Sequence, residues 1–371
     1  MSLRTLIVDD TVTYRKILAD ILNDVPETEV VGTAPSGAIA LKKIPLDKVQ
    51  LVFLDEHMPE MDGLETLKHI KKEFPETVVV MISGISTRSA DTTIEALQLG
   101  AIDFIRKPDG NDLSANRAQL TNDILAVLKL IKLRNFISGA SDKNTGKAGF
   151  QSKGAPSFVE KIVRSEPISL LPRTPTTFGV CVIGVSTGGP EALSKLVPAF
   201  KGPLPVPILC VQHMPPMFTK SLADSLAKKS KLPVVEATEN EEIRPGIMYI
   251  APGGRHMIVR TKDGKTIIGV NDEPPVNSCR PSVDVLFRSV AEVFGARGVL
   301  SVVLTGMGND GCNGVRALKR HGCYSITQSE QTCVVYGMPR AVDEAGLSDR
   351  SLPLDAIPGE IETLVKSPYV I

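Results

Sequence analysis

The feature that most constrains the fold is an alternation of short apolar segments with segments of helical period, which occurs twice along the chain. In the first part, the apolar segments have the length of strands, and the segments between them place apolar residues three and four apart, as βα units do. Strands are expected at 6–8, 30–32, 51–54, 78–82 and 104–105, and helices at 14–22, 64–74, 92–99 and 120–133. This series favours a doubly wound parallel sheet.

The alternation resumes from Gly179, after a stretch that is rich in Ser, Gly, Lys and Pro. Strands are expected at 180–185, 207–211, 247–251 and 299–305, and helices at 191–197, 218–228, 283–294 and 315–321. A chain of 371 residues exceeds what a single hydrophobic core usually supports. We therefore expect an α/β domain over residues 1–125, a helix end and flexible linker over 126–177, and a second doubly wound parallel α/β domain over 178–371.

Composition excludes several classes of function. With 42 basic and 42 acidic residues, the chain has no excess positive charge to attract nucleic acid or an anionic membrane. It shows no signal-peptide pattern and no apolar run of about 18 residues, so we expect a soluble cytoplasmic protein without membrane insertion. All six cysteines lie at position 181 or later without a CxxC pair, which favours reduced thiols. The default expectation for the oligomeric state is a monomer.

A cluster of carboxylates is predicted in the first domain. Asp9 and Asp10 end the first strand, Asp55 ends the third, and Lys107 follows the fifth. Any one of these aspartates is more often a solvated turn former. Together they would meet in the crevice outside the carboxyl ends of the strands. Such a cluster suits Mg²⁺, with Asp55 as a phosphoryl acceptor and Lys107 as the counter-charge.

This part of the chain resembles the response-regulator receiver domain. The resemblance rests on VDD at 8–10, LDEHMPEMDGLE at 54–65, Ser83, and the pair Lys107-Pro108. It implies the flavodoxin-like fold, Mg²⁺-dependent phosphorylation of Asp55 by a histidine kinase, and a switch at Ser83 and Phe104 together with Lys107.

A serine in a glycine-rich turn is the first candidate for chemistry in the second domain. Ser186 lies in GVSTGGP at 184–190, which follows an expected strand and opens a helix. The pattern G-x-S-x-G exposes a nucleophilic serine on a sharp turn, where the N-terminus of the helix stabilises an oxyanion. The same loop is also a common phosphate cradle, and this segment alone leaves both interpretations open.

A serine nucleophile needs a base and an acid that orients the base. His213 directly follows the expected strand at 207–211, whereas His256, the competing histidine, is expected in a loop. Asp310 stands in a glycine-rich turn after the last long apolar run. An Asp-Gly turn that caps the next helix is an equally good interpretation of Asp310 alone.

The second domain resembles the chemotaxis protein-glutamate methylesterase. The matching segments are GVSTGG at 184–189, QHMP at 212–215, RPSVDVLF at 280–287, LTGMGNDG at 304–311 and VVYGMPRAV at 334–342. The resemblance implies that Ser186 is the nucleophile, His213 the general base and Asp310 its orienter, with backbone near Thr187 and Met307 in the oxyanion hole.

The resemblance also implies a substrate and a reaction. The substrate is a methylated glutamate on the signalling helices of a chemoreceptor, deamidation of receptor glutamine is a related activity, and the hydrolase needs no cofactor. Two other classes stay open from the residues alone, namely a nucleotide- or phosphate-binding module and a non-catalytic output domain. Because the linker keeps both domains close, we expect the receiver face near Phe104 to cover the mouth formed by the Ser186 and Asp310 loops until Asp55 is phosphorylated.

Overall fold

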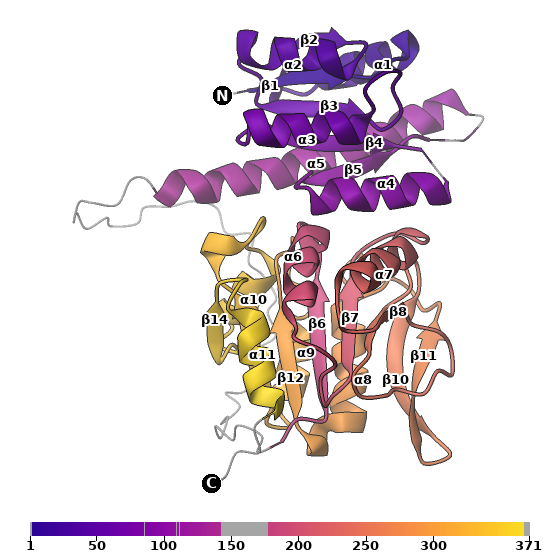
Figure 1. Ribbon diagram of the computed structural model, residues 1–371, viewed down its shortest axis with the longest axis vertical. Helices are drawn as coiled ribbons and strands as arrows, with labels where there is room; N and C mark the ends of the chain where they lie inside the picture. The colour runs from indigo at the N-terminus through magenta and orange to yellow at the C-terminus, as the bar shows by residue number, and fades with distance from the viewer. Residues whose placement is uncertain (1, 85, 109, 111, 142–176, 367–371) are drawn as a thin grey trace, which may run out of the picture.

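The computed structural model describes residues 2–84, 86–108, 110, 112–141 and 177–366, and forms two α/β domains (Figure 1). Most of the expected linker, 142–176, lies outside the described residues. The first domain occupies the upper part of the view in Figure 1, and the second domain lies below it.

The first domain is a parallel sheet with helices on both faces, and the expected flavodoxin-like fold is confirmed. Its strand order is β2-β1-β3-β4-β5, which is the flavodoxin order. The strands are β1 (Leu3–Val8), β2 (Thr28–Ala34), β3 (Leu51–Asp55), β4 (Val78–Ser83) and β5 (Asp103–Arg106). The helices are α1 (Val12–Asn23), α2 (Gly37–Leu46), α3 (Gly63–Glu73), α4 (Thr87–Gln98) and α5 (Leu113–Ser141).

Two helices of this domain differ from the expectation. Helix α2 was not expected, because Gly37 at its start and Pro45 in its last turn weaken the helical signal of the segment. Its buried residues Ala40 and Ile44 lie four apart and face the core. Helix α5 begins at Leu113 and continues to Ser141, so it is longer at both ends than the helix expected at 120–133.

The second domain is also built on a parallel sheet, as expected. Its seven strands have the order β14-β13-β12-β6-β7-β9-β8. They are β6 (Val180–Val185), β7 (Ile208–Gln212), β8 (Val234–Glu236), β9 (Met248–Ile250), β12 (Val299–Val303), β13 (Tyr324–Gln328) and β14 (Arg350–Leu352). The α-helices are α6 (Gly189–Leu196), α7 (Phe218–Lys229), α8 (Val283–Phe294), α9 (Cys312–Lys319), α10 (Met338–Glu344) and α11 (Ile357–Lys366). Short 3-10 turns are η1 (Val197–Ala199), η2 (Gly295–Arg297) and η3 (Glu330–Thr332).

An antiparallel hairpin, β10 (His256–Lys262) and β11 (Lys265–Asn271), was not expected beside this sheet. Its turn is Asp263-Gly264, and both residues have positive φ, as a tight two-residue hairpin turn requires. The placement of His256 in a loop was wrong, because His256 is the first residue of β10 and is fully buried.

The two domains pack against each other through α4 of the first domain and α6 and α7 of the second (Figure 1). The rings of Phe104 and Phe218 lie across the boundary, with their centroids 4.5 Å apart and their planes tilted by 33°. Gln98, at the end of α4, accepts hydrogen bonds from Ser225 and Lys229 of α7.

A hydrophobic cluster also joins the first domain to loops of the second. Its buried members include Ile124, Leu128 and Ile131 of α5 together with Val335 of the second domain. Met307 and Val334 pack against the same cluster. The first domain therefore reaches the loops at the carboxyl edge of the second sheet.

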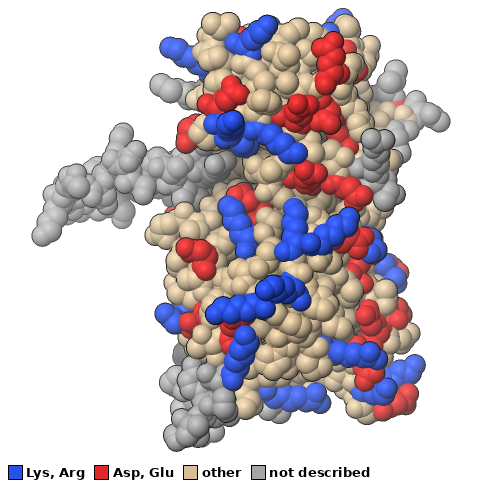
Figure 2. Space-filling model, in the orientation of Figure 1, with Lys and Arg blue, Asp and Glu red and all other residues tan. Residues whose placement is uncertain are grey.

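Charges of both signs are interspersed over the visible face of both domains (Figure 2). None of the helices that the structure describes is both long enough and apolar enough to cross a bilayer.

Candidate active site

The candidate site lies where the winding of the second sheet reverses. Strand β6 is central, the chain continues to β7 on one side, and it later returns to β12 on the other side. The loops after β6 and β12 therefore diverge and leave a crevice, where doubly wound proteins bind their ligands. Ser186 follows β6, His213 follows β7, and Asp310 lies in the loop after β12.

Strand register places Ser186 and His213 side by side. Val185 pairs with Gln212 in the parallel ladder between β6 and β7, so the next residues, Ser186 and His213, occupy neighbouring positions. Adjacent strands lie about 4.8 Å apart, and residues at paired positions share a face of the sheet. The His213 N–H donates to the Val185 carbonyl, which continues the ladder to this point.

Glycines make the sharp turn around Ser186. Gly188 caps α6 with a φ of 75°, a backbone conformation that L side chains rarely adopt. A Cβ on Gly306 would lie 2.7 Å from Ser186 Cβ, so only glycine lets the two loops approach this closely. The carbonyl of Ser186 accepts hydrogen bonds from Gly189 N–H and from the Gln212 amide.

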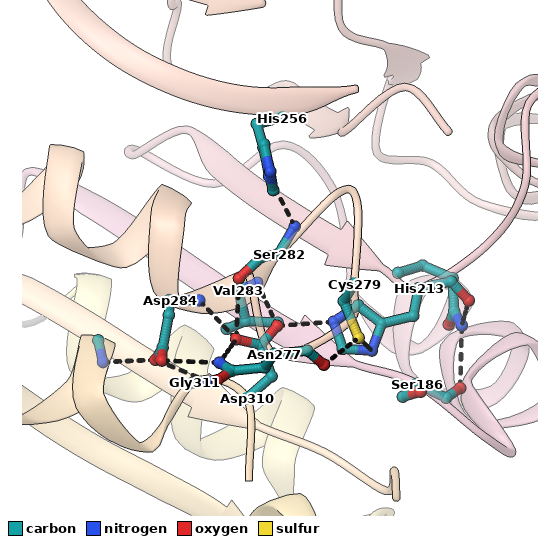
Figure 3. A network of polar contacts seen from close by, with 12 residues as sticks. Ser186, His213, His256, Asn277, Cys279, Ser282, Val283, Asp284, Asp310 and Gly311 are labelled. Carbon is teal, nitrogen blue, oxygen red and sulfur yellow. Dashed lines mark hydrogen bonds and ion pairs between the residues drawn. The ribbon is translucent and has the colours of Figure 1, made fainter. Parts of the chain in front are cut away.

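The structure brings His213 and Asp310 together. His213 Nε2 lies 2.8 Å from Asp310 Oδ2, and both side chains are largely buried, with 12% and 2% of their surface exposed (Figure 3). Asp310 Oδ2 also accepts the Val283 N–H, while Oδ1 accepts hydrogen bonds from Asn277, Ser282 and the Asp284 N–H. Asp310 therefore accepts five hydrogen bonds, which leaves it poorly suited to hold the metal that a phosphate-binding module would require.

Two carboxylates cap each other's helices beside this pair. Asp310, just before α9, accepts N–H groups of Val283 and Asp284 at the start of α8. Asp284, in the first turn of α8, accepts the N–H groups of Gly311 and Gly314 at the start of α9. A carboxylate is stabilised at a helix N-terminus by the free N–H groups and the helix dipole. Asp310 therefore caps α8 and not the next helix, α9, as the turn interpretation expected, and the same carboxylate also contacts His213.

Burial and pairing shift the pKa values of this pair in opposite directions. Burial alone would lower the pKa of His213, but the hydrogen bonds to Asp310 and Cys279 raise it to about 9. Burial alone would raise the pKa of Asp310. The hydrogen bond and the positive charge of His213, together with hydrogen bonds from the Asn277 side chain and the Val283 N–H, instead lower that pKa to about 2. The pair is therefore most stable as imidazolium and carboxylate, and His213 must lose a proton before it can act as a base.

The hydroxyl of Ser186 is not engaged by the imidazole. Within the part of the chain that the structure describes, no hydrogen bond links Ser186 Oγ to His213. The nitrogen of His213 that Asp310 leaves free, Nδ1, instead lies 3.5 Å from the sulfur of Cys279 (Figure 3). Catalytic hydrogen bonds are often long before substrate binds, so this arrangement is compatible with a triad that closes on the substrate.

The two backbone groups expected in the oxyanion hole are available. In the described regions, no hydrogen bond occupies the N–H of Thr187 or that of Met307. Both residues belong to the loops that flank Ser186, and the Thr187 carbonyl is fixed by the hydroxyl of Thr305. A pair of free N–H groups beside a nucleophile is what a tetrahedral oxyanion needs.

His256, the competing histidine, is structural. Its Nδ1 accepts the Ser282 N–H, and its Nε2 lies 3.1 Å from the carbonyl oxygen of Pro274. These contacts require the neutral tautomer with the proton on Nε2, and both nitrogens are then occupied. His256 thus fixes the loop before α8 and has no free nitrogen for a serine.

Several residues of the site carried no assigned role in the sequence analysis. Asn277 donates to both Asp284 and Asp310, and Ser282 donates to Asp310. They and Cys279 lie within or just before the segment RPSVDVLF at 280–287. That segment was the sequence signal that could have drawn attention to these residues. Their proximity to Asp310 arises only when the chain folds, so the sequence alone does not show it.

The carboxylates of the first domain also converge as expected. Asp9, Asp10 and Asp55 each offer an oxygen within 4.8 Å of the others. Lys107 Nζ lies 2.9 Å from Asp9 Oδ2 and 2.6 Å from Asp55 Oδ1. Burial raises the pKa of Asp55 to about 6 in spite of Lys107. This set of hard oxygen donors fits Mg²⁺, which tolerates few protein ligands and keeps several waters.

Of the expected switch residues, only Phe104 has a contact with the second domain among the hydrogen bonds, ion pairs and ring contacts of the described residues. The hydroxyl of Ser83 donates to Glu56 Oε2 at 2.8 Å and accepts from Thr93, so it is directed at Glu56 and not at Asp55. Phe104 stacks on Phe218 of the second domain. Glu56, a buried carboxylate whose pKa is raised by burial, had no role in the sequence analysis.

Comparisons with known proteins place both domains in known families. Residues 181–361 match the family described as CheB methylesterase, and residues 5–117 match the response regulator receiver domain. A protein-glutamate methylesterase/protein-glutamine glutaminase of Desulfotalea psychrophila is 44% identical over 98% of this chain and 99% of its own length. A relative with the same description from Pyrococcus horikoshii is 38% identical over 100% of this chain and 94% of its own length. The crystal structure of the Thermotoga maritima CheB methylesterase catalytic domain is 42% identical, covers 51% of this chain and 100% of that chain, and has a TM-score of 0.49. The chain belongs to the CheB methylesterase family, with a response-regulator receiver domain preceding the methylesterase domain.

Proposed function

We propose that this protein is a receiver-controlled protein-glutamate methylesterase that acts on methylated chemoreceptors in the cytoplasm, as a monomer. It also deamidates receptor glutamines, which need the same acyl transfer. The observation that carries the proposal is the buried His213 and Asp310 pair at the mouth of the crevice, with Ser186 at the neighbouring strand position. The receiver spans residues 1–125, the end of α5 and a linker follow over 126–177, and the hydrolase spans 178–371.

The first chemical step forms an acyl-enzyme. His213, once neutral, takes the Ser186 hydroxyl proton on Nδ1 while Nε2 keeps its hydrogen bond to Asp310. Ser186 Oγ then attacks the ester carbonyl carbon of the γ-methyl glutamate. The N–H groups of Thr187 and Met307 stabilise the oxyanion, and the proton passes from His213 to the methoxide oxygen, so that methanol leaves.

The second step regenerates the enzyme. Water gives a proton to His213 and attacks the acyl carbon, and Ser186 leaves with that proton, so glutamate is released. With a glutamine substrate the first leaving group is ammonia instead of methanol. The chemistry at Ser186 is otherwise the same, and His213 serves as base and acid in turn.

The receiver supplies control. A histidine kinase is the phosphodonor for Asp55, and the modification adds negative charge beside Lys107. Mg²⁺ held by Asp9, Asp10 and Asp55 would offset the charges of the carboxylates and the phosphoryl group. The packing of Phe104 on Phe218, and of Met307 and Val334 on the cluster shared with α5, supports a closed state in which the receiver covers the mouth of the crevice. Repacking of Ser83 and Phe104 after phosphorylation lowers the population of that state.

The test is methanol release from receptor-containing membranes that carry radiolabelled methyl esters. The full-length protein should release methanol, and release should increase with a small-molecule phosphodonor. Ser186→Ala should abolish release while the matched change Ser194→Ala, on the next helix, leaves it intact. If Ser186→Ala released methanol at the wild-type rate, the proposed nucleophile would be wrong.

A further inference from the structure

Cys279 gives the active site a thiol that the proposed reaction does not use. Its sulfur lies 3.5 Å from His213 Nδ1, and the Asn277 carbonyl lies 3.4 Å from the same sulfur. The donor atoms of His213, Cys279 and Asp310 all lie within 4.8 Å of one another. Imidazole and thiolate are the ligands that Zn²⁺ and similar soft divalent cations prefer.

The spacing of the two donors fits a tetrahedral cation. Bonds of about 2.3 Å to sulfur and 2.0 to 2.1 Å to nitrogen, at the tetrahedral angle, place the two donor atoms about 3.5 Å apart. His213 Nδ1 and Cys279 Sγ already have this separation, so a cation could bridge them without a change in the distance between the two atoms, after a turn of the imidazole that aims Nδ1 beside the sulfur.

Asp310 completes the arrangement without binding the cation itself. Histidines that bind metals usually donate their second ring N–H to a carboxylate, which fixes the tautomer and the direction of the free nitrogen. The contact between His213 Nε2 and Asp310 Oδ2 has this geometry and leaves Nδ1 directed at Cys279 (Figure 3). Two buried carboxylates, Asp284 and Asp310, add negative charge that favours a cation at this position.

We propose that His213 and Cys279 form an inhibitory site for a thiophilic divalent cation such as Zn²⁺. Water molecules fill the remaining coordination positions, and binding releases two protons, one from the Cys279 thiol and one from Nδ1 of the His213 imidazolium. A cation on Nδ1 occupies the nitrogen that would take the Ser186 proton, so the bound form cannot start the acyl transfer. Binding of the cation to His213 and Cys279 does not depend on the proposed methylesterase function, whereas the inhibition rests on that proposed function.

The same geometry does not make Cys279 a second nucleophile. The Cys279 N–H is held by the Val276 carbonyl, and the free N–H groups of Thr187 and Met307 lie in the loops that flank Ser186. An acyl group on the sulfur would therefore lack the oxyanion donors that Ser186 has nearby.

The experiment uses the full-length protein in excess Mg²⁺, which fills the carboxylate cluster of the receiver. Co²⁺ is titrated first, because thiolate bound to Co²⁺ gives a near-ultraviolet charge-transfer band that carboxylates do not give. Zn²⁺ is then titrated in the methanol-release assay, with each variant normalised to its own metal-free rate. Cys279→Ser removes the proposed ligand, and Cys333→Ser is the matched control, since Cys333 is another partly exposed thiol of this domain.

We expect the wild type and Cys333→Ser to show the cobalt band and reversible inhibition by Zn²⁺ that a chelator removes. Cys279→Ser should lose the band and require at least about tenfold more Zn²⁺ for half inhibition, the scale of loss seen when support of a metal ligand is removed. A band that persists in Cys279→Ser would overturn the proposal. Inhibition that is equal in all three proteins would also overturn it.

Discussion

Removing the aromatic contact between the domains should activate the enzyme without phosphorylation. The rings of Phe104 and Phe218 lie 4.5 Å apart between centroids, and Phe218 is 5% exposed. A stacked aromatic pair contributes about 0.5 to 1.5 kcal/mol beyond its burial. Phe104→Ala would remove both the aromatic contact and some buried apolar area. It should therefore destabilise the closed state by about 1 to 2 kcal/mol, which changes the equilibrium between the closed and open states by a factor of about 5 to 30.

The assay is methanol release with and without a small-molecule phosphodonor. Phe104→Ala should raise the donor-free rate by about 5- to 30-fold while the closed state still predominates, and the donor should then add less than it adds to the wild type. Phe218→Ala should have a similar effect from the other side of the contact. The double variant should fall short of the sum of the two free-energy changes, because each single change already removes the stack.

Phe74→Ala is the matched control. Phe74 is a half-buried phenylalanine of the receiver that follows α3, and the structure gives it no ring contact with the second domain among the described residues. It tests whether loosening the receiver core is enough to activate the enzyme. If Phe104→Ala and Phe218→Ala were no more active than the wild type without donor, the covering contact would not be what limits the closed enzyme.

The remaining predictions concern the triad and the phosphorylation site. His213→Ala should lower kcat about 10² to 10⁴-fold. His256→Ala should lower the melting temperature and should lower kcat much less than His213→Ala does. Equal losses of kcat in the two variants would contradict the assignment of the base. Because the pKa of His213 is raised to about 9, the base is protonated at lower pH, and kcat/KM should increase about tenfold for each pH unit up to about 9; a pH-independent rate between 6 and 8 would argue against this state of the pair. Asp310→Asn should retain more activity than Ser186→Ala in the same methanol assay, since the acid orients the base without bonding to substrate. Asp55→Ala should stay at the basal rate with any phosphodonor, and stimulation by donor would place the phosphorylated residue elsewhere.

Strands with continuous apolar runs could be predicted from the sequence because burial on both faces leaves a strong local signal. Strands β6 and β12, and the residues that follow them, were found in this way. The hairpin β10 and β11 was missed although Asp263-Gly264 is a good turn signal, and the segment up to His256 was interpreted as a loop. Helix α2 was missed because Gly37 and Pro45 disfavour a helix locally, and tertiary packing of Ala40 and Ile44 overrides them.

The residues of the candidate site that directly follow a strand could be predicted from the sequence. Ser186 and His213 follow strands directly, so the topology alone places them together. Cys279 and Asn277 come from a loop whose path depends on His256 and on the start of α8, so no local pattern could place them beside His213. The direction of the Ser83 hydroxyl depends on its hydrogen bond to Glu56. Ser83 ends β4 and Glu56 directly follows β3, so the two residues are far apart in the sequence and meet only in the folded sheet.

The mutual capping of α8 and α9 by Asp310 and Asp284 means that one carboxylate serves both the folding and the chemistry of this domain. An N-cap contributes about 1 kcal/mol, and each aspartate here satisfies backbone groups of the other's helix. A related protein that no longer acts on the substrate would still need Asp310, because the N–H groups at the start of α8 would otherwise lose their hydrogen-bond acceptor. A degenerate copy of this enzyme should therefore keep its acid after it has lost its serine, and the presence of the aspartate alone is a poor guide to activity.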